Sequence, residues 1–240
     1  MFDKDFAIKQ KEIRSTNYGD TMKKIVLFIV IVFLVNTLLG REYRPGDHEL
    51  CLMPTAYTMP VGDRYFTDYE LAILNFTFAP SEGTHLGIFS LFPVTKQFVD
   101  TFSFGIKQNY MRTKYIESAV WLAFVPKIKA VNIGNVISVS NENSSVHIGI
   151  SALSGSFTKK TEYVFMIGSK FKLSERTSLI AEYGNLQSWI TEEPDGIALF
   201  GIRFQGKRVA WDIAGIRPLF DVGNDLLIIP LVKATVYFSK

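Results

Sequence analysis

Apolar side chains recur at every second position along most of the chain after residue 41. The clearest apolar series are Phe102, Phe104 and Ile106; Val120, Leu122 and Phe124; Val146, Ile148 and Ile150; and Ala198, Phe200, Ile202 and Phe204. A period of two is typical of β-strands, because successive side chains point to opposite faces of the sheet. The positions in between hold Gly, Ser, Ala and isolated charges. Each strand therefore has one apolar face and one face of small or polar side chains.

The same pattern, followed along the chain, predicts about twelve strands, and it is also compatible with ten. They are residues 50–57, 69–78, 84–91, 99–107, 116–125, 131–139, 145–152, 162–171, 178–186, 196–204, 208–216 and 227–238. Tight connections, at residues 79–83, 174–176 and 205–207, occur together with longer ones at 60–68, 153–161, 187–195 and 217–226. Short turns that alternate with longer loops, and an even strand number, are typical of a bacterial outer-membrane barrel.

The chemistry of the two faces separates a membrane barrel from a soluble sandwich. A soluble β-sandwich buries its apolar faces and has charged outer faces, whereas a membrane barrel turns its apolar faces to lipid. Because the small and polar faces resemble a barrel lumen, we predict an all-β, transmembrane antiparallel up-and-down β-barrel with Phe104, Leu122, Ile148 and Phe200 facing lipid. We also predict an aromatic girdle near the strand ends, made of Tyr65, Phe66, Tyr69, Tyr110, Tyr115, Trp189 and Phe238.

The first forty residues indicate a targeting segment. Lys23 and Lys24 precede an uncharged run, residues 25–39, and the chain becomes polar again at Arg41. This run is shorter than the about 20 apolar residues of a membrane-spanning helix, and it fits a secretory signal peptide. We predict an N-terminal extension and signal peptide over residues 1–40, cleaved after about Gly40, and an outer-membrane barrel domain over 41–240. The alternative is an uncleaved helix that anchors a β-domain.

Composition excludes several classes of protein. The 240 residues are 48% hydrophobic and 20% charged, with a net charge of +3, which is too weak to indicate nucleic-acid binding. Cys51 is the single cysteine, so the chain has no internal disulfide and no multi-cysteine metal motif. Only His48, His85 and His147 are available as histidine ligands. We therefore predict no cofactor and no metal.

Charged residues recur on the predicted lumenal face of five successive strands. They are Lys170, Glu182, Arg203, Asp212 and Lys233. Such residues can form a cross-strand ladder that offsets the cost of buried charge and fills the interior, with Arg203 between Glu182 and Asp212. The same residues can instead line a narrow aqueous path for small ions. We favour the structural role.

His147 and Ser151 form the one local pair of candidate catalytic groups. Both lie on the predicted inner face, but four residues at about 3.3 Å each separate them by about 13 Å, which is beyond hydrogen-bond reach. A lumenal packing histidine is the better interpretation. No catalytic residue is proposed, and we predict that the protein is not an enzyme. The alternatives from other classes are a barrel enzyme that acts on lipid and a periplasmic β-sandwich binding module.

Two stretches resemble a known group of proteins. They are Leu52-Met53-Pro54-Thr55-Ala56 with Gly62 and Tyr65, and a last strand at residues 231–238 that ends on an aromatic. With the signal peptide, they resemble the small, largely uncharacterised outer-membrane β-barrel proteins of Gram-negative bacteria. The resemblance implies a location in the bacterial outer membrane and assembly by the outer-membrane insertion machinery, although Ser239 and Lys240 follow Phe238.

The expected function follows from the barrel and from this resemblance. We expect a porin-like monomer in contact with outer-membrane lipid. It acts either as a small passive pore for small solutes or as a structural envelope protein whose lumen is largely filled.

Overall fold

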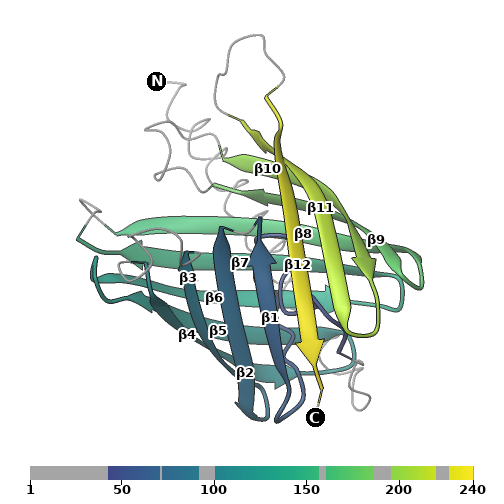
Figure 1. The fold of residues 1–240 in the computed structure, drawn as a ribbon, viewed down its shortest axis with the longest axis horizontal. Coiled ribbons are helices and arrows are strands. Elements are labelled where there is room, and N and C mark those ends of the chain that lie inside the picture. Colours follow the sequence, from purple (N-terminus) through teal and green to yellow (C-terminus); the bar gives the residue numbers. More distant parts are fainter. Residues whose placement is uncertain are drawn as a thin grey trace, which may run out of the picture. The chain divides into compact units, whose positions relative to one another are not determined.

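The sheet closes on itself, because twelve strands pair antiparallel in chain order and β1 also pairs with β12 (Figure 1). The computed structural model describes residues 43–70, 72–91, 101–156, 161–185, 196–219 and 227–239. The strands are β1 (Arg64–Tyr69), β2 (Ile73–Ser81), β3 (Thr84–Leu91), β4 (Ser103–Arg112), β5 (Ile116–Val125), β6 (Ala130–Ser140), β7 (Ser144–Ser154), β8 (Glu162–Ser174), β9 (Thr177–Gly184), β10 (Ile197–Gln205), β11 (Val209–Pro218) and β12 (Ile229–Phe238). The predicted signal peptide, residues 1–40, lies outside these ranges. Within them, no helix is long and apolar enough to span a membrane.

The predicted fold class is confirmed, and two predicted elements were wrong. β3 and β5 have the predicted bounds, and most other strands are shifted at one or both ends. Residues 50–57 are not a strand, because the backbone N–H groups of Cys51, Leu52 and Met53 bind a side chain, Glu182, rather than a neighbouring strand. The first strand is instead β1, in the region that the sequence assigned to a loop at residues 60–68.

β1 has no apolar stripe, which explains why the pattern missed it. Its outward positions are Arg64, Phe66 and Asp68, and its inward positions include Tyr65 and Tyr69. Tyr65 is buried, and the Tyr69 hydroxyl binds Glu49 in the lumen. The prediction that Tyr65 and Tyr69 belong to an outer girdle was therefore wrong.

Other predicted girdle residues do lie on the outside. Tyr110, Tyr115 and Phe238 are exposed. Trp189 lies outside the described residues.

The two ends of the barrel differ in the length of their connections. At one end the strands are joined by short turns, residues 82–83, 113–115, 141–143, 175–176 and 206–208. At the other end lie the longer connections 92–102, 155–161, 185–196 and 219–228, together with two short ones at 70–72 and 126–129. We call these the short-turn end and the long-loop end. Arg64 pairs with Phe238, so β1 begins and β12 ends at the short-turn end, near the C label in Figure 1.

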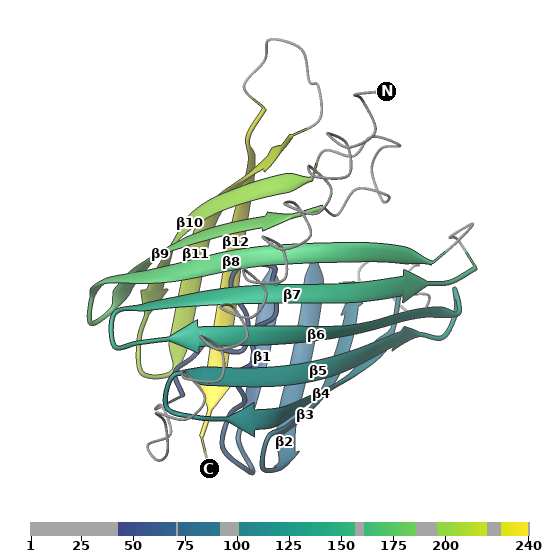
Figure 2. The same ribbon diagram turned by 180° about the vertical axis from the view of Figure 1, so that it is seen from behind.

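The outer surface is apolar, as the alternation predicted. Phe104, Leu122, Ile148 and Phe200 are between 42% and 67% exposed, and they lie on four different strands. The back of the barrel, formed by β5 to β8, is a broad continuous wall (Figure 2). Exposed Phe, Leu and Ile across such a wall are characteristic of a lipid-facing band.

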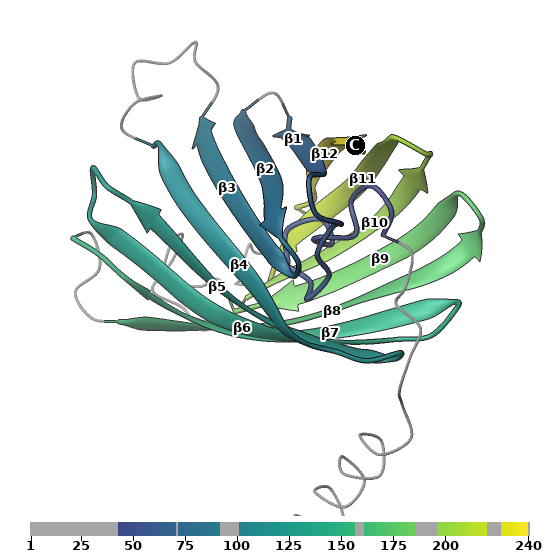
Figure 3. The same cartoon turned by 90° about the horizontal axis from the view of Figure 1, so that it is seen from below.

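Residues 43–63 lie inside the barrel, and we call this segment the plug (Figure 3). It consists of turns with a single β-bridge between Glu49 and Pro54. It enters at the short-turn end, where Arg44 contacts Glu175, and it leaves at the same end, where the Gly62 N–H bonds to the Ala79 carbonyl. The plug is thus a loop that goes in and comes back through one mouth.

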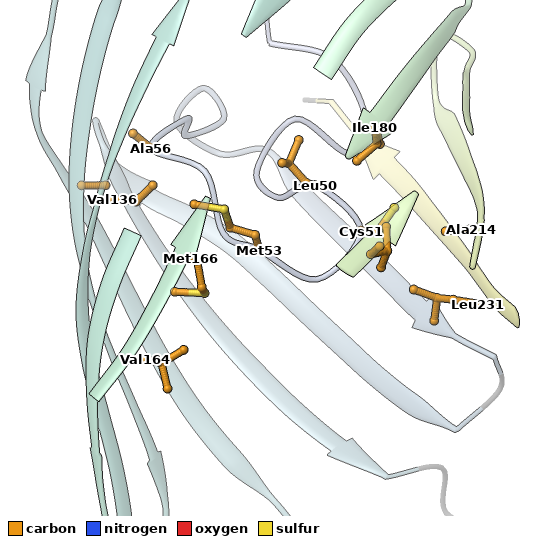
Figure 4. Packing of buried hydrophobic residues seen from close by; sticks show 12 residues of the cluster. Leu50, Cys51, Met53, Ala56, Val136, Val164, Met166, Ile180, Ala214 and Leu231 are labelled. Carbon is orange, nitrogen blue, oxygen red and sulfur yellow. The ribbon is translucent and has the colours of Figure 1, made fainter. Parts of the chain in front are cut away.

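The plug packs against the wall through apolar side chains. Leu50, Cys51, Met53 and Ala56 form one cluster with wall residues that include Val136, Val164, Met166, Ile180, Ala214 and Leu231 (Figure 4). Two wall glycines make room for it: a Cβ at Gly168 would collide with Leu50, and a Cβ at Gly149 would come within 3.3 Å of Met53. These two glycines of the small-residue lumenal face therefore lie beneath the plug.

Candidate functional site

The five charges predicted for the lumen all lie buried inside the barrel. Three of them form a cross-strand row on β10, β11 and β12, because Arg203 pairs in register with Asp212 and Asp212 pairs with Lys233. Arg203 Nε and Nη2 donate to the two Asp212 oxygens at 2.6 and 2.7 Å, and Lys233 Nζ lies 3.0 Å from Asp212 Oδ2. One carboxylate thus serves two buried cations.

Both cations of this row also bind the plug. Arg203 donates to the carbonyls of Gly46 at 2.5 Å and of Glu49 and Leu50 at 3.1 Å. Lys233 donates to the carbonyls of Leu50 and Cys51 and lies 3.3 Å from Glu49 Oε1. Gly46 has a positive φ of 80°, and a Cβ there would come within 3.1 Å of the Arg203 guanidinium. Glycine is needed at this position both for its backbone conformation and for the close approach of Arg203.

The other two predicted charges do not extend the ladder. Lys170 Nζ binds Asp47 of the plug at 2.6 Å. The Glu182 carboxylate accepts hydrogen bonds from the backbone N–H groups of Cys51, Leu52 and Met53. The expectation that Arg203 lies between Glu182 and Asp212 was therefore wrong, because Glu182 faces the plug backbone and the second partner of Asp212 is Lys233.

The opposite wall holds the plug with residues that the sequence did not single out. Lys107 Nζ on β4 donates to the carbonyls of His48, Thr55 and Tyr57 at 2.9 to 3.2 Å. Asn109 donates to the Ala56 carbonyl, and His85 Nε2 accepts from the Met59 N–H at 2.8 Å. The sequence held one indication of this role: Lys107 is an inward lysine on a predicted strand, and no acidic residue lies in register with it. Its partners are carbonyl groups, which leave no trace in a sequence.

A cluster of ionisable plug residues faces β1 and was also missed. The His48 ring stacks on Tyr65 with centroids 3.6 Å apart, and its Nε2 lies 3.0 Å from Glu49 Oε1. Burial lowers the pKa of His48 to about 4, although the negative charge of Glu49 acts in the opposite direction. The ring is therefore neutral near pH 7. Burial alone would raise the pKa of Glu49, but Lys233 and His48 bring it well below its usual range. The plug therefore sits with a neutral His48 and an ionised Glu49.

The buried neutral histidine predicts that acid loosens the plug. A solvated His48 has a pKa of about 6.5, above its value of about 4 in the seated plug. The released plug therefore binds more protons, and the stability that His48 gives the seated state, fully present above pH 6.5, is lost as the pH falls toward 4. The reporter is Cys51, the single and fully buried cysteine. Its reaction with 4,4′-dithiodipyridine, normalised to unfolded protein at each pH, should accelerate below about pH 6.5.

His48→Gln is the matched control for this titration. The amide stays neutral throughout, so the acceleration over this pH range should become smaller. Glu49, whose pKa is well below its usual range in the seated plug, and His85, which accepts the Met59 N–H, are present in both proteins and account for the part that remains. A normalised rate that is equal at pH 7 and pH 4 in the native sequence would contradict the binding of a neutral His48.

His147 has partners other than the one considered from the sequence. Its two ring nitrogens lie 2.7 Å from Ser138 Oγ and 3.0 Å from Ser145 Oγ, and the side chain is fully buried. Ser138 in turn accepts from the Ala56 N–H of the plug. His147 thus supports the wall that holds the plug. In the described ranges there is no group of three or more His, Cys, Asp or Glu residues that could hold a metal ion.

Comparison with known proteins finds likeness at the level of the fold. No family model and no curated protein matches the sequence. Among solved structures, the KdgM porin aligns at 7% identity with a TM-score of 0.49, over 74% of this chain and 98% of that one. A triple mutant of Rhodopseudomonas blastica porin aligns at 12% identity with a TM-score of 0.41, over 69% of this chain and 55% of that one. This chain thus spans about half the length of the second porin. From the pairing of its own strands, the chain is a closed twelve-stranded antiparallel β-barrel, and it is similar to outer-membrane porins.

Proposed function

We propose that the protein is an outer-membrane β-barrel that its own plug keeps closed at rest, so that it acts as a structural envelope protein with a filled lumen. The main support is the bonding of the lumenal charges. Arg203, Lys233, Lys170 and Glu182 each bind the plug, and none of these contacts would exist in an open, water-filled pore. In this proposal the five charges are structural residues.

The location and surroundings belong to the same proposal. The exposed apolar outer face suits outer-membrane lipid, and the difference between the two ends suits periplasmic turns at the short-turn end. The last strand, which ends on the exposed Phe238, suits recognition by the outer-membrane insertion machinery. We propose these as its partners and propose that the barrel is a monomer.

A second candidate, a gated pore, is favoured by the path of the plug. Because the plug enters and leaves through one mouth, it can be withdrawn from the lumen without threading the chain through the barrel. Withdrawal toward the short-turn end would open a path for small solutes.

Conductance across a planar lipid bilayer tests the closed state. The native barrel should show no conductance steps, whereas a variant with residues 46–58 replaced by a Gly/Ser segment of equal length should show stable ones. The replacement removes the plug's partners for Arg203, Lys233, Lys170 and Glu182, which water then solvates. Val61→Ser is the control, because Val61 is exposed at the short-turn end and the substitution leaves those bonds in place.

Two outcomes would contradict the plug as the closing element. One is a native barrel that conducts as well as the replaced variant. The other is a replaced variant that shows no conductance although it keeps the heat-dependent gel migration of a folded barrel.

A further inference from the structure

A cavity of about 250 Å³ lies between the plug and the wall, on the side of the long-loop end. Its apolar lining includes Leu52 and Met53 of the plug and Trp121, Leu153, Val164 and Leu199 of the wall. This chemistry is unusual for its location, because the interior of a membrane barrel is normally polar. Met53, Val164 and Leu199 also belong to the cluster through which the plug packs against the wall, so the space left between these side chains is lined mainly by apolar atoms.

The apolar lining is local rather than a general property of this lumen. A cavity of about 360 Å³ at the short-turn end is lined by Arg44, Lys170, Lys172 and Glu175 with Asn and Ser side chains. The cavity of about 250 Å³ is mainly apolar, although Glu182 also lines it, and the carboxylate of Glu182 accepts hydrogen bonds from the plug backbone.

The walls of the apolar cavity are fixed in position. The Trp121 indole lies over Gly134, where a Cβ would collide with it, and its Nε1 donates to Asn132 Oδ1 at 3.2 Å. Its polar atom is thus satisfied, and the ring lines the cavity. From the plug, Leu52 is 37% exposed although its backbone N–H is bound by Glu182. Two anchored apolar surfaces therefore remain apart instead of collapsing on each other.

We propose that this cavity binds a small apolar molecule, namely a single-ring aromatic compound or a hydrocarbon of similar volume. An apolar cavity of about 150 Å³ is known to hold benzene, so this one accommodates one ring with a few further carbon atoms. The Ser151 and Asn132 side chains add a polar margin that could orient a substituted ring. The site needs the seated plug as one wall, but it does not depend on whether the barrel conducts.

Bromobenzene is the probe, because a bound heavy atom quenches indole fluorescence. The chain has three tryptophans, so Trp189→Phe with Trp211→Phe leaves Trp121 as the single emitter. In lipid nanodiscs, quenching should rise to a plateau at one bromobenzene per barrel. Partition into lipid alone would give quenching that rises linearly with the bromobenzene content of the membrane.

Two substitutions in this background decide whether the cavity is the site. Val164→Phe fills the cavity and should raise the dissociation constant of bromobenzene, measured from the saturable quenching, by about tenfold or more. Ile167→Phe, on the same strand but facing lipid, is the matched control and should bind as the parent does. Ser151→Leu also fills the cavity and serves if Val164→Phe does not fold.

Linear quenching in the parent would overturn the proposal, and so would a saturable component that survives both filling substitutions. Conductance of the parent is recorded separately. A barrel that conducts but still binds bromobenzene would contradict the proposed closed state and leave the proposed cavity site supported.

Discussion

Replacing Asp212 by Ala should lower the free energy of unfolding by about 3 to 5 kcal/mol. Asp212 lies between Arg203 and Lys233, at 2.6 and 3.0 Å, and all three side chains are almost completely buried. Its removal leaves two neighbouring cations without their shared carboxylate. The measurement is guanidinium unfolding of detergent-refolded protein, followed by Trp fluorescence.

Comparison with the single substitutions of its partners makes this test specific. Arg203→Ala and Lys233→Ala each leave the carboxylate with one cation, but each also removes hydrogen bonds to plug carbonyls, so the single costs alone do not isolate the ion pairs. Double-mutant cycles that pair Asp212→Ala with either should give a coupling energy well above zero. Glu142→Ala is the control, since Glu142 is exposed on the turn between β6 and β7 and the unfolding midpoint should not move. Zero coupling in both cycles would mean that the three groups are solvated independently.

Ile148→Arg should destabilise the barrel by about 2 to 4 kcal/mol. Ile148 is 49% exposed at the middle of β7, where an outward cation would face the hydrocarbon of the bilayer. The matched control is Leu173→Arg, outward and exposed but near the short-turn end of β8, where the cost should be about 0 to 1 kcal/mol. Equal costs at the two depths, measured by unfolding in lipid vesicles, would contradict the lipid-facing assignment.

The plug changes what to expect on the inner face. Small lumenal residues such as Gly149 would tolerate polar substitution in an open barrel, and the alternation of the sequence predicts this. Gly149 instead lies beneath Met53 and Met166, so Gly149→Arg must displace the plug. Reaction of Cys51 with a thiol reagent separates the two faces: it should accelerate with Gly149→Arg and stay slow with Ile148→Arg.

The sequence predicted the wall of the barrel well because a strand's two faces are recorded in neighbouring residues. Phe104 and Gly105, or Ile148 and Gly149, differ so strongly that a single period of two assigns both the strand and its orientation. The inward charges followed from the same parity, since Arg203 and Asp212 share the face opposite Phe200 and Ile213.

The plug could not be predicted from that pattern. Residues 50–57 combine apolar and small side chains in a way that also fits a strand, and no local signal shows that Glu182, 129 residues away from Met53, binds their backbone. Backbone carbonyls such as those of Gly46 and Leu50 occur in every residue type, so the sequence does not show which of them bind a side chain. The girdle assignment of Tyr65 and Tyr69 failed for a related reason, because an aromatic near a strand end suits a lipid interface as well as a packed lumen.

The long separation of these contacts has a consequence for how the barrel forms. Arg203 meets Gly46 across 157 positions and Lys233 meets Leu50 across 183, so the most buried cations of the plug's binding site are on strands that come last in the chain. Contacts between residues so far apart in the sequence form late and slow the folding of a β-protein. Until β10, β11 and β12 are in place, the plug lacks the Arg203 and Lys233 donors to its carbonyls. Once they are, Glu49 and the plug carbonyls bind cations that the closing strands would otherwise bury with Asp212 alone, so seating of the plug and closure of the barrel should stabilise each other.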